Sequence, residues 1–176
     1  MDELQDGRLT LMGLFAESYK GLHGTLEARL GREVGLPMQW FELLLRLARS
    51  PEHRLRMTDL AAQTGLTPSG LTRAVDRLCA AGLVERVACP ADRRVAYAAL
   101  TPAGLERIRA AVAPHLRHID ESLDGALTDD ERRALGRLLR KLRDHVNPAA
   151  ATVTPSPEGE GPPPPAATVL DSVPTD

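Results

Sequence analysis

Apolar residues recur at helical spacing along most of the chain, and the clearest such stretch runs from residue 58 to residue 82. Six apolar positions there are expected to face a core. They are Leu60, Ala61, Leu66, Leu71, Val75 and Leu78. The polar positions of the second half are Ser69, Thr72, Arg73, Asp76 and Arg77. The pattern predicts two short helices, of which the second presents two arginines to solvent.

The ends of these helices carry residues typical of helix caps. Thr58 is expected to cap the first helix, and Thr67 followed by Pro68 predicts the start of the second. Between them, residues 65–67 form a three-residue turn with a glycine, which is the length found at a helix-turn-helix corner. The second helix is expected to end near Gly82, in a left-handed cap.

Beyond residue 82 the apolar spacing changes from helical to alternating. Residues 83–88 and 95–100 are predicted strands, joined by a loop that contains a proline. The tip of this loop carries Asp92, Arg93 and Arg94. Arginines suit the narrow, electronegative minor groove, and a nearby carboxylate can fix one guanidinium by a bidentate pair. We therefore expect a DNA-binding wing beside the helix-turn-helix.

The combined pattern resembles the core of the MarR family of bacterial transcription regulators. The resemblance rests on GLTPSGLTRAVDRLCAAGLVER at 65–86, PADRR at 90–94 and LTPAG at 100–104. In the order of its elements it extends over roughly residues 8–146.

This resemblance implies a mainly α fold with a small β-hairpin wing, in a domain of residues 1–146. The reading head would cover about residues 54–100. Dimerisation helices would cover about residues 4–31 and 102–146. The implied protein is a ligand-responsive repressor, not an enzyme, that binds a pseudo-palindromic operator in double-stranded DNA as a homodimer.

The resemblance also assigns roles to the polar residues of the module. Arg73 would read a base in the major groove, and Arg94, oriented by Asp92, would enter the minor groove. Ser69, Thr72 and Arg77 would mainly contact phosphates, and Arg93 is the second arginine of the wing tip. The alternative for each arginine is a solvated surface residue.

Helical patterns flank the module on both sides. The first helix carries Met12, Phe15, Ala16, Tyr19, Leu22, Leu26 and Leu30. It and a second helix that starts after Pro37 are expected to pack against the reading head. Near the other end, residues 128–131 predict a capping box that opens a last helix with one apolar stripe. By resemblance, the dimer seam would contain Leu9, Leu135, Leu138, Leu139, Leu142 and Val146.

Four of the five aromatic residues lie in the first two long helices. Family members bind small ligands, often aromatic acids, between the dimerising helices and the reading head. A small aromatic or acidic effector is therefore expected, and its candidate site residues are Phe15, Tyr19, Met38, Trp40 and Met57. The alternative is that these side chains are simply core.

Charge is unevenly distributed along a chain whose net charge is only −2. Residues 54–94 hold seven arginines against four acidic residues, and local charge is what phosphates experience. Residues 147–176 hold four acids, no base and eight of the fourteen prolines. This acidic, proline-rich tail is expected to be disordered.

Other function classes find little support. The chain lacks a glycine-rich phosphate loop, a nucleophile elbow and a nucleotide fingerprint, so no enzyme activity and no cofactor are expected. A winged-helix protein-interaction module without DNA binding is the main alternative. No stretch reaches the roughly 18 apolar residues of a membrane span, and the acidic start differs from a signal peptide, so a cytoplasmic location is expected.

Metal- or redox-responsive regulation is a further alternative. His115, His118 and Glu121 stand three residues apart but form an incomplete metal site, and surface helix residues are the simpler interpretation. Cys79 is interpreted as a small core residue, and Cys89 as a more exposed one. The family's peroxide sensors carry a reactive cysteine in the first helix, and this chain has none there.

Overall fold

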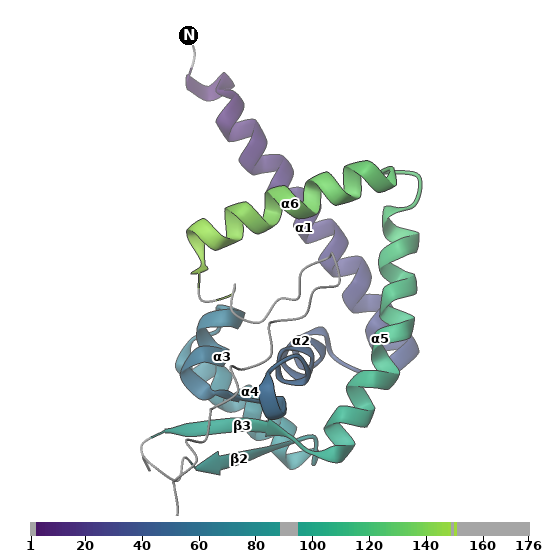
Figure 1. Ribbon diagram of the computed structural model, residues 1–176. Helices are drawn as coiled ribbons and strands as arrows, with labels where there is room; N and C mark the ends of the chain where they lie inside the picture. Colours follow the sequence, from purple (N-terminus) through teal and green to yellow (C-terminus); the bar gives the residue numbers. More distant parts are fainter. Residues whose placement is uncertain (1–2, 89–94, 149, 151–176) are drawn as a thin grey trace, which may run out of the picture.

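Three long helices, α1 (Gly7–Arg29), α5 (Pro102–Leu123) and α6 (Asp129–Val146), extend from a smaller body of short helices and a sheet (Figure 1). The computed structural model describes residues 3–88, 95–148 and 150. The short helices are η1 (Glu3–Gln5), the π-helix η2 (Leu30–Val34), α2 (Met38–Ala48), η3 (Pro51–His53), α3 (Met57–Thr64) and α4 (Pro68–Ala80). The strands are β1 (Arg54–Arg56), β2 (Val84–Ala88) and β3 (Ala96–Leu100).

The core of the body forms where α2, α3, α4 and α5 meet. Leu60, Leu71, Val75 and Leu78 are fully buried there, as their spacing predicts, while Ala61 and Leu66 are half-buried at its edge. From α2 come Phe41, Leu43, Leu44 and Leu47, and from α5 comes Ile108. Removing such side chains from water is the main stabilising contribution to this body.

Three of the four predicted helix caps are present. The Thr67 hydroxyl accepts a hydrogen bond from the Gly70 amide, at 3.1 Å, and the capping box at the start of α6 is complete. Gly82 adopts the left-handed conformation just beyond α4, with φ +70°. The prediction for Thr58 is wrong: α3 already begins at Met57, because it follows directly from β1, and the Thr58 hydroxyl instead donates to Asp59.

The sheet has three antiparallel strands in the order β1-β3-β2. The predicted hairpin is formed by β2 and β3, in a register that places Val84 opposite Leu100 and Ala88 opposite Ala96. Strand β1 was not predicted from the sequence; its three residues are too few for an alternating pattern to stand out. The tip of the hairpin, with Cys89, Asp92, Arg93 and Arg94, lies outside the described residues.

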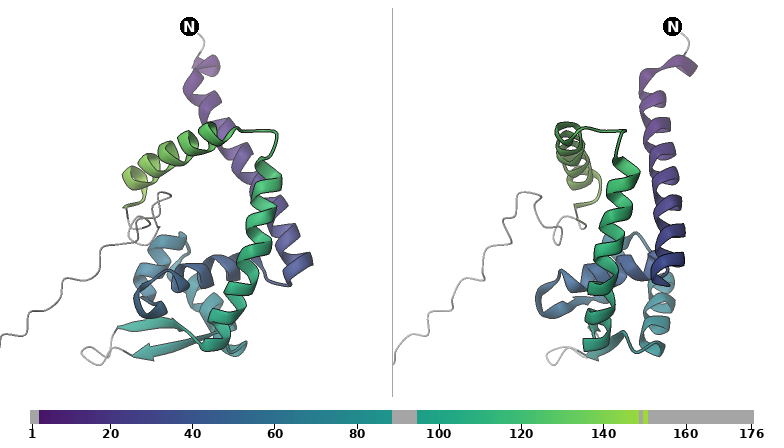
Figure 2. Two further views of the ribbon diagram at one scale, coloured as in Figure 1. Left: turned by 45° about the vertical axis from the view of Figure 1, so that its right-hand side comes forward. Right: turned by 90° about the vertical axis from the view of Figure 1, so that its right-hand side faces the viewer.

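The N-terminal half of α1 does not pack against the body, contrary to expectation. Figure 2 shows this half projecting beyond the other elements. Met12, Phe15 and Tyr19 are exposed, whereas Leu26 near the end of α1 and Leu30 at the start of η2 are buried. The predicted apolar stripe therefore has two parts, of which one completes the core and the other is left uncovered in this chain.

Candidate nucleic-acid interface

Helix α4 divides its residues between the core and solvent. Leu71, Ala74, Val75 and Leu78 are buried on one side. The other side exposes Ser69, Thr72, Arg73, Asp76 and Arg77. This separation holds the polar face of α4 outward on a rigid support, as groove recognition by a helix requires.

Arg73 lies in the middle of this exposed face. Within the described part of the chain it forms no ion pair and no hydrogen bond, so its five N–H donors remain available to a ligand. Arg77, one turn further along, donates to the Gln39 side chain of α2 at 3.5 Å, which is a weak contact. The two arginines therefore differ in their freedom to reach outward.

An ion pair joins the exposed face of α4 to the hairpin. Arg86 on β2 donates to the Asp76 carboxylate, with 2.7 Å between Nη2 and Oδ1. A second, longer bond of 3.4 Å runs from the same nitrogen to the Thr72 carbonyl. The pair holds the base of the hairpin against α4. Sequence reasoning missed Arg86, because a pairing between a helix and a strand ten residues away has no fixed spacing.

A second group of basic residues lies on the sheet, and it was not predicted from the sequence. Arg54 and Arg56 of β1 flank the Tyr97 ring of β3, with guanidinium carbons 5.4 and 5.9 Å from its centroid. Arg56 also donates to the Tyr97 hydroxyl at 3.2 Å, and Arg54 pairs with Glu52. These contacts add two ordered cations beside the hairpin.

The turn that follows α4 is hydrogen-bonded to the residue that precedes α5. Thr101 donates its hydroxyl to the Gly82 carbonyl at 2.7 Å and its amide to the Leu83 carbonyl at 3.1 Å. Gly104, buried in the first turn of α5, lies directly against the same Leu83 carbonyl. These contacts join the first turn of α5 directly to the turn that follows α4.

Helix α5 is also fastened to the corner between α1 and α2. Arg107 donates to the carbonyls of Val34 and Gly35, at 2.5 and 3.1 Å. His118 lies 2.6 Å from the Glu33 carboxylate, and the hydrogen bond from His118 lowers the pKa of Glu33. Arg29 of α1 pairs with Glu121. Three side-chain links thus join α5 to the π-helical corner.

The interpretation of His115 and His118 as surface residues is wrong, since both are buried. His115 packs against the Phe41 ring, with 4.4 Å between centroids, and Glu121 is engaged by Arg29. In the described ranges no group of three His, Cys, Asp or Glu side chains could hold a metal ion. Cys79 is half-buried, and burial raises the pKa of its thiol, which disfavours the reactive thiolate.

Comparison with known proteins agrees with this geometry. A sequence model of the MarR family matches residues 34–95. The crystal structure of Sco3205, a MarR family transcriptional regulator from Streptomyces coelicolor in complex with DNA, is 33% identical, with a TM-score of 0.72. The match covers 82% of this chain and 91% of that one. The chain belongs to the MarR family.

Two further relatives place this MarR-family chain among transcriptional regulators. The crystal structure of AbsC, a MarR family transcriptional regulator from Streptomyces coelicolor, is 29% identical with a TM-score of 0.73, over 83% of this chain and 98% of AbsC. The HTH-type transcriptional repressor YetL of Bacillus subtilis (strain 168) is 29% identical over 136 residues, which are 77% of this chain and 80% of YetL. These relatives are regulators, not enzymes, and the predicted winged-helix fold is confirmed.

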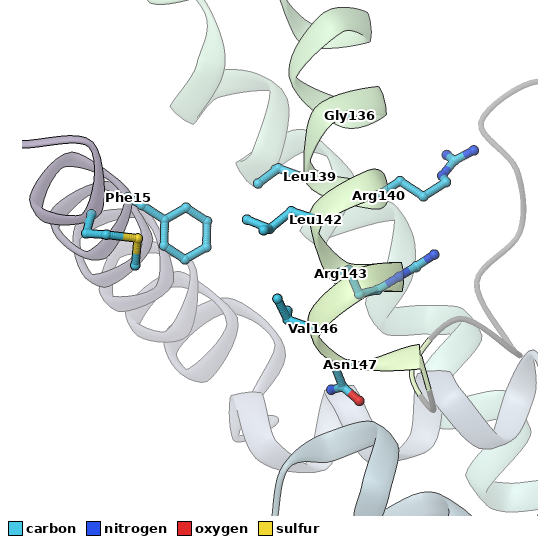
Figure 3. A pocket seen from close by; sticks show the side chains of 9 residues that line it. Phe15, Gly136, Leu139, Arg140, Leu142, Arg143, Val146 and Asn147 are labelled. Carbon is cyan, nitrogen blue, oxygen red and sulfur yellow. The ribbon is translucent and has the colours of Figure 1, made fainter. Parts of the chain in front are cut away.

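A cavity of about 640 Å³ lies between α1 and α6 of the MarR-family chain. Figure 3 shows Phe15 of α1 directed toward Leu139, Leu142 and Val146 of α6, while Arg140 and Arg143 extend away from it. Helix α6 buries none of its residues, and its predicted stripe is exposed. The two helices therefore face each other with uncovered apolar side chains.

The five candidate effector residues lie in three different surroundings. Phe15 borders the cavity between α1 and α6, and Tyr19 is exposed on α1 with its ring 5.4 Å from that of His23. Met38 is buried in the core, and Trp40 and Met57 pack half-buried against it.

Among the described helices, none is both long and apolar enough to cross a membrane.

Proposed function

We propose that this protein is a sequence-specific DNA-binding transcriptional regulator that binds a pseudo-palindromic operator as a homodimer. The observation that carries the proposal is the exposed face of α4, where Arg73 has no partner within the described chain and the buried face is fixed in the core. A relative that shares this fold at 33% identity, Sco3205, has been crystallised with DNA. A module that bound only protein would not need an unpaired guanidinium at this position.

In this proposal α4 lies in the major groove. Arg73 donates two hydrogen bonds to a guanine edge, the commonest specific contact of an arginine. Ser69, Thr72 and Arg77 contact phosphates and set the register of the helix, without reading sequence. From the sequence alone, we assign Arg93 and Arg94 to the minor groove, with Asp92 orienting Arg94; these three lie outside the described residues.

The homodimer is supported by the apolar surface that α1 and α6 leave exposed. Its members are between 41 and 67% exposed in the single chain. They are Leu9, Met12, Phe15, Tyr19, Leu135, Leu138, Leu139, Leu142 and Val146. An apolar surface of this extent marks an interface in soluble proteins. We assign the cavity between α1 and α6 to apolar side chains of the second copy.

We further propose that a small aromatic or acidic effector controls DNA affinity and that the protein acts as a repressor in the cytoplasm. Repression is supported by the relative YetL, named a transcriptional repressor. For the effector we retain Phe15, Tyr19, Met38, Trp40 and Met57 as candidates. A ligand bound by residues of this set would act by changing the distance between the two copies of α4, which must match half-sites about one helical turn apart.

Selection of bound fragments from a random duplex library tests the proposal. We expect enrichment of an inverted repeat whose half-sites are separated by roughly 10 base pairs between centres. Binding of the enriched duplex should weaken steeply with salt, because phosphate contacts release counterions. If no sequence is enriched and all duplexes are bound equally weakly, the protein is not a sequence-specific regulator and the protein-interaction alternative is favoured.

A further inference from the structure

The middle of α5 carries an unusual buried group at a weak point of the helix. Pro114 lies inside α5 and has no amide hydrogen to donate to the helix. The next residue, His115, is buried, and its ring packs on Phe41 of α2 at a tilt of 49°. In the described structure its Nδ1 has no hydrogen-bond partner. A buried imidazole thus lies where the helix has lost one of its own hydrogen bonds.

One turn later, His118 fixes α5 to a second element. Its side chain is 3% exposed, and Nε2 meets the Glu33 carboxylate of η2 at 2.6 Å. The other ring nitrogen, Nδ1, is also buried without a hydrogen-bond partner among the described residues. The two histidines therefore hold α5 against α2 and η2. If either ring gained a proton at Nδ1, the new N–H would have no acceptor among the described residues.

We propose that His115 makes the joint between α5 and α2 sensitive to acid, so that protonation of its ring loosens this joint and weakens DNA binding. The proposal rests on the proposed DNA-binding function. It concerns a group that neither the α4 surface nor the seam between α1 and α6 uses.

The charges around His115 explain the direction of the effect. Burial lowers the pKa of His115 below its ordinary value of 6.5, and the neighbouring His118 lowers it further. The described charged groups nearby lie around His118, one turn along α5: Glu33 and Arg32 from η2, Arg29 from α1 and Glu121 from α5 itself. From α2 the ring meets Phe41, which supplies no hydrogen-bond acceptor. Glu33 is already engaged by His118, and Glu121 by Arg29.

Linkage then sets the pH range. A group whose pKa is lower in the folded state stabilises that state fully above the unfolded value, and the contribution is lost as the pH falls toward the folded value. For His115 the loss begins as the pH falls below about 6.5. The second proton would make Nδ1 a donor, and this atom is buried without an acceptor among the described residues, so a movement of α5 away from Phe41 would relieve the cost.

Such a movement reaches the DNA-binding face through the start of α5. Thr101 and Gly104 pack on the backbone of Gly82 and Leu83, directly after α4. A displacement of α5 therefore alters the position of α4 relative to the long helices. In a dimer this changes the distance between the two reading heads, and affinity falls.

The test is titration of the selected duplex with the full-length protein at pH 7.5 and pH 5.5, at constant salt. We expect the wild-type affinity to fall by about threefold or more, because protonation of the buried ring is linked to the loss of the DNA-binding arrangement. His115→Phe keeps a ring packed on Phe41 but cannot titrate. Between the two pH values, the DNA affinity of this variant should change by less than half as much as that of the wild type. The control is His145→Asn, on the exposed end of α6. Its DNA affinity should fall between pH 7.5 and pH 5.5 as much as that of the wild type.

A second readout is the NMR titration of the His115 ring in the wild-type protein, which does not depend on the variant folding. A midpoint below 6.5 supports the proposal, and a midpoint at or above 6.5 overturns it. Equal wild-type affinity at both pH values, or an undiminished fall in His115→Phe, also overturns it. Absence of sequence-specific binding at pH 7.5 would instead refute the proposed function itself.

Discussion

Gly104 in the first turn of α5 lies against the carbonyl oxygen of Leu83, so closely that a methyl group on its α-carbon would be 1.9 Å from that oxygen. Only a residue without a side chain permits this approach. Through it, the first turn of α5 packs directly on the turn that follows α4. The contact joins the helices proposed for dimerisation to the helix proposed for DNA recognition.

Gly104→Ala should destabilise the folded protein. The clashing atom belongs to the backbone, so relief requires α5 to shift, and we expect a loss of about 1–3 kcal/mol in the free energy of unfolding, as for other overpacked sites. Urea denaturation measures it. Gly24→Ala in α1 is the matched control, since nothing lies within 4 Å of the added methyl group. That change should stabilise the helix by about 0.5–1 kcal/mol, and equal effects of the two substitutions would show that the Leu83 contact is not restrictive.

The Arg86–Asp76 pair should matter more for DNA binding than for stability. Both side chains are partly exposed, so Arg86→Ala should reduce the free energy of unfolding by less than about 1 kcal/mol. It leaves the Asp76 carboxylate uncompensated on the DNA-facing side of α4, where phosphates repel it, and operator affinity should fall severalfold. Adding Asp76→Asn should restore part of that affinity in the double variant. If the double variant binds as weakly as Arg86→Ala, the arginine acts by another route.

The apolar face of α6, exposed in the single chain, should be buried when a second copy of the protein binds to it. Leu139→Glu or Leu142→Glu would place an unpaired charge in the proposed seam, at a loss of about 3 kcal/mol or more, and weaken association by at least about a hundredfold. Arg137→Glu puts the same side chain on the opposite face of α6 and should leave association unchanged. Analytical ultracentrifugation at micromolar concentration distinguishes these results. A wild-type monomer, or a dimer unaffected by the leucine substitutions, would contradict the assigned interface.

The sequence was most informative where structure depends on neighbouring residues. The Thr67-Pro68 start of α4, the capping box of α6 and the left-handed Gly82 are local features, and the structure confirms each. The alternation that predicts β2 and β3 and the helical spacing of Leu60, Leu71, Val75 and Leu78 are likewise short-range patterns. These features were enough to predict the winged-helix fold and the exposed face of α4.

Long-range relationships could not be read in this way. The burial of His115 depends on where Phe41 lies, 74 positions earlier in the chain, and the pairing of His118 with Glu33 depends on the π-helical corner after α1. The exposure of Met12 and Phe15 likewise depends on α1 projecting from the body, which an apolar stripe alone does not indicate. A stripe that packs within the chain and one that packs on a second copy have the same sequence pattern.

The most direct test of sequence recognition by α4 compares Arg73→Ala and Arg77→Ala on the selected operator and on a random duplex of equal length, at one salt concentration. If Arg73 reads a base edge, its loss should reduce operator affinity by about 1–3 kcal/mol and random-duplex affinity little. Arg77, assigned to phosphate, should weaken binding to both duplexes alike. Equal losses on the two duplexes for Arg73→Ala would contradict base reading by Arg73, because the exposed face of α4 would then supply charge and not sequence recognition.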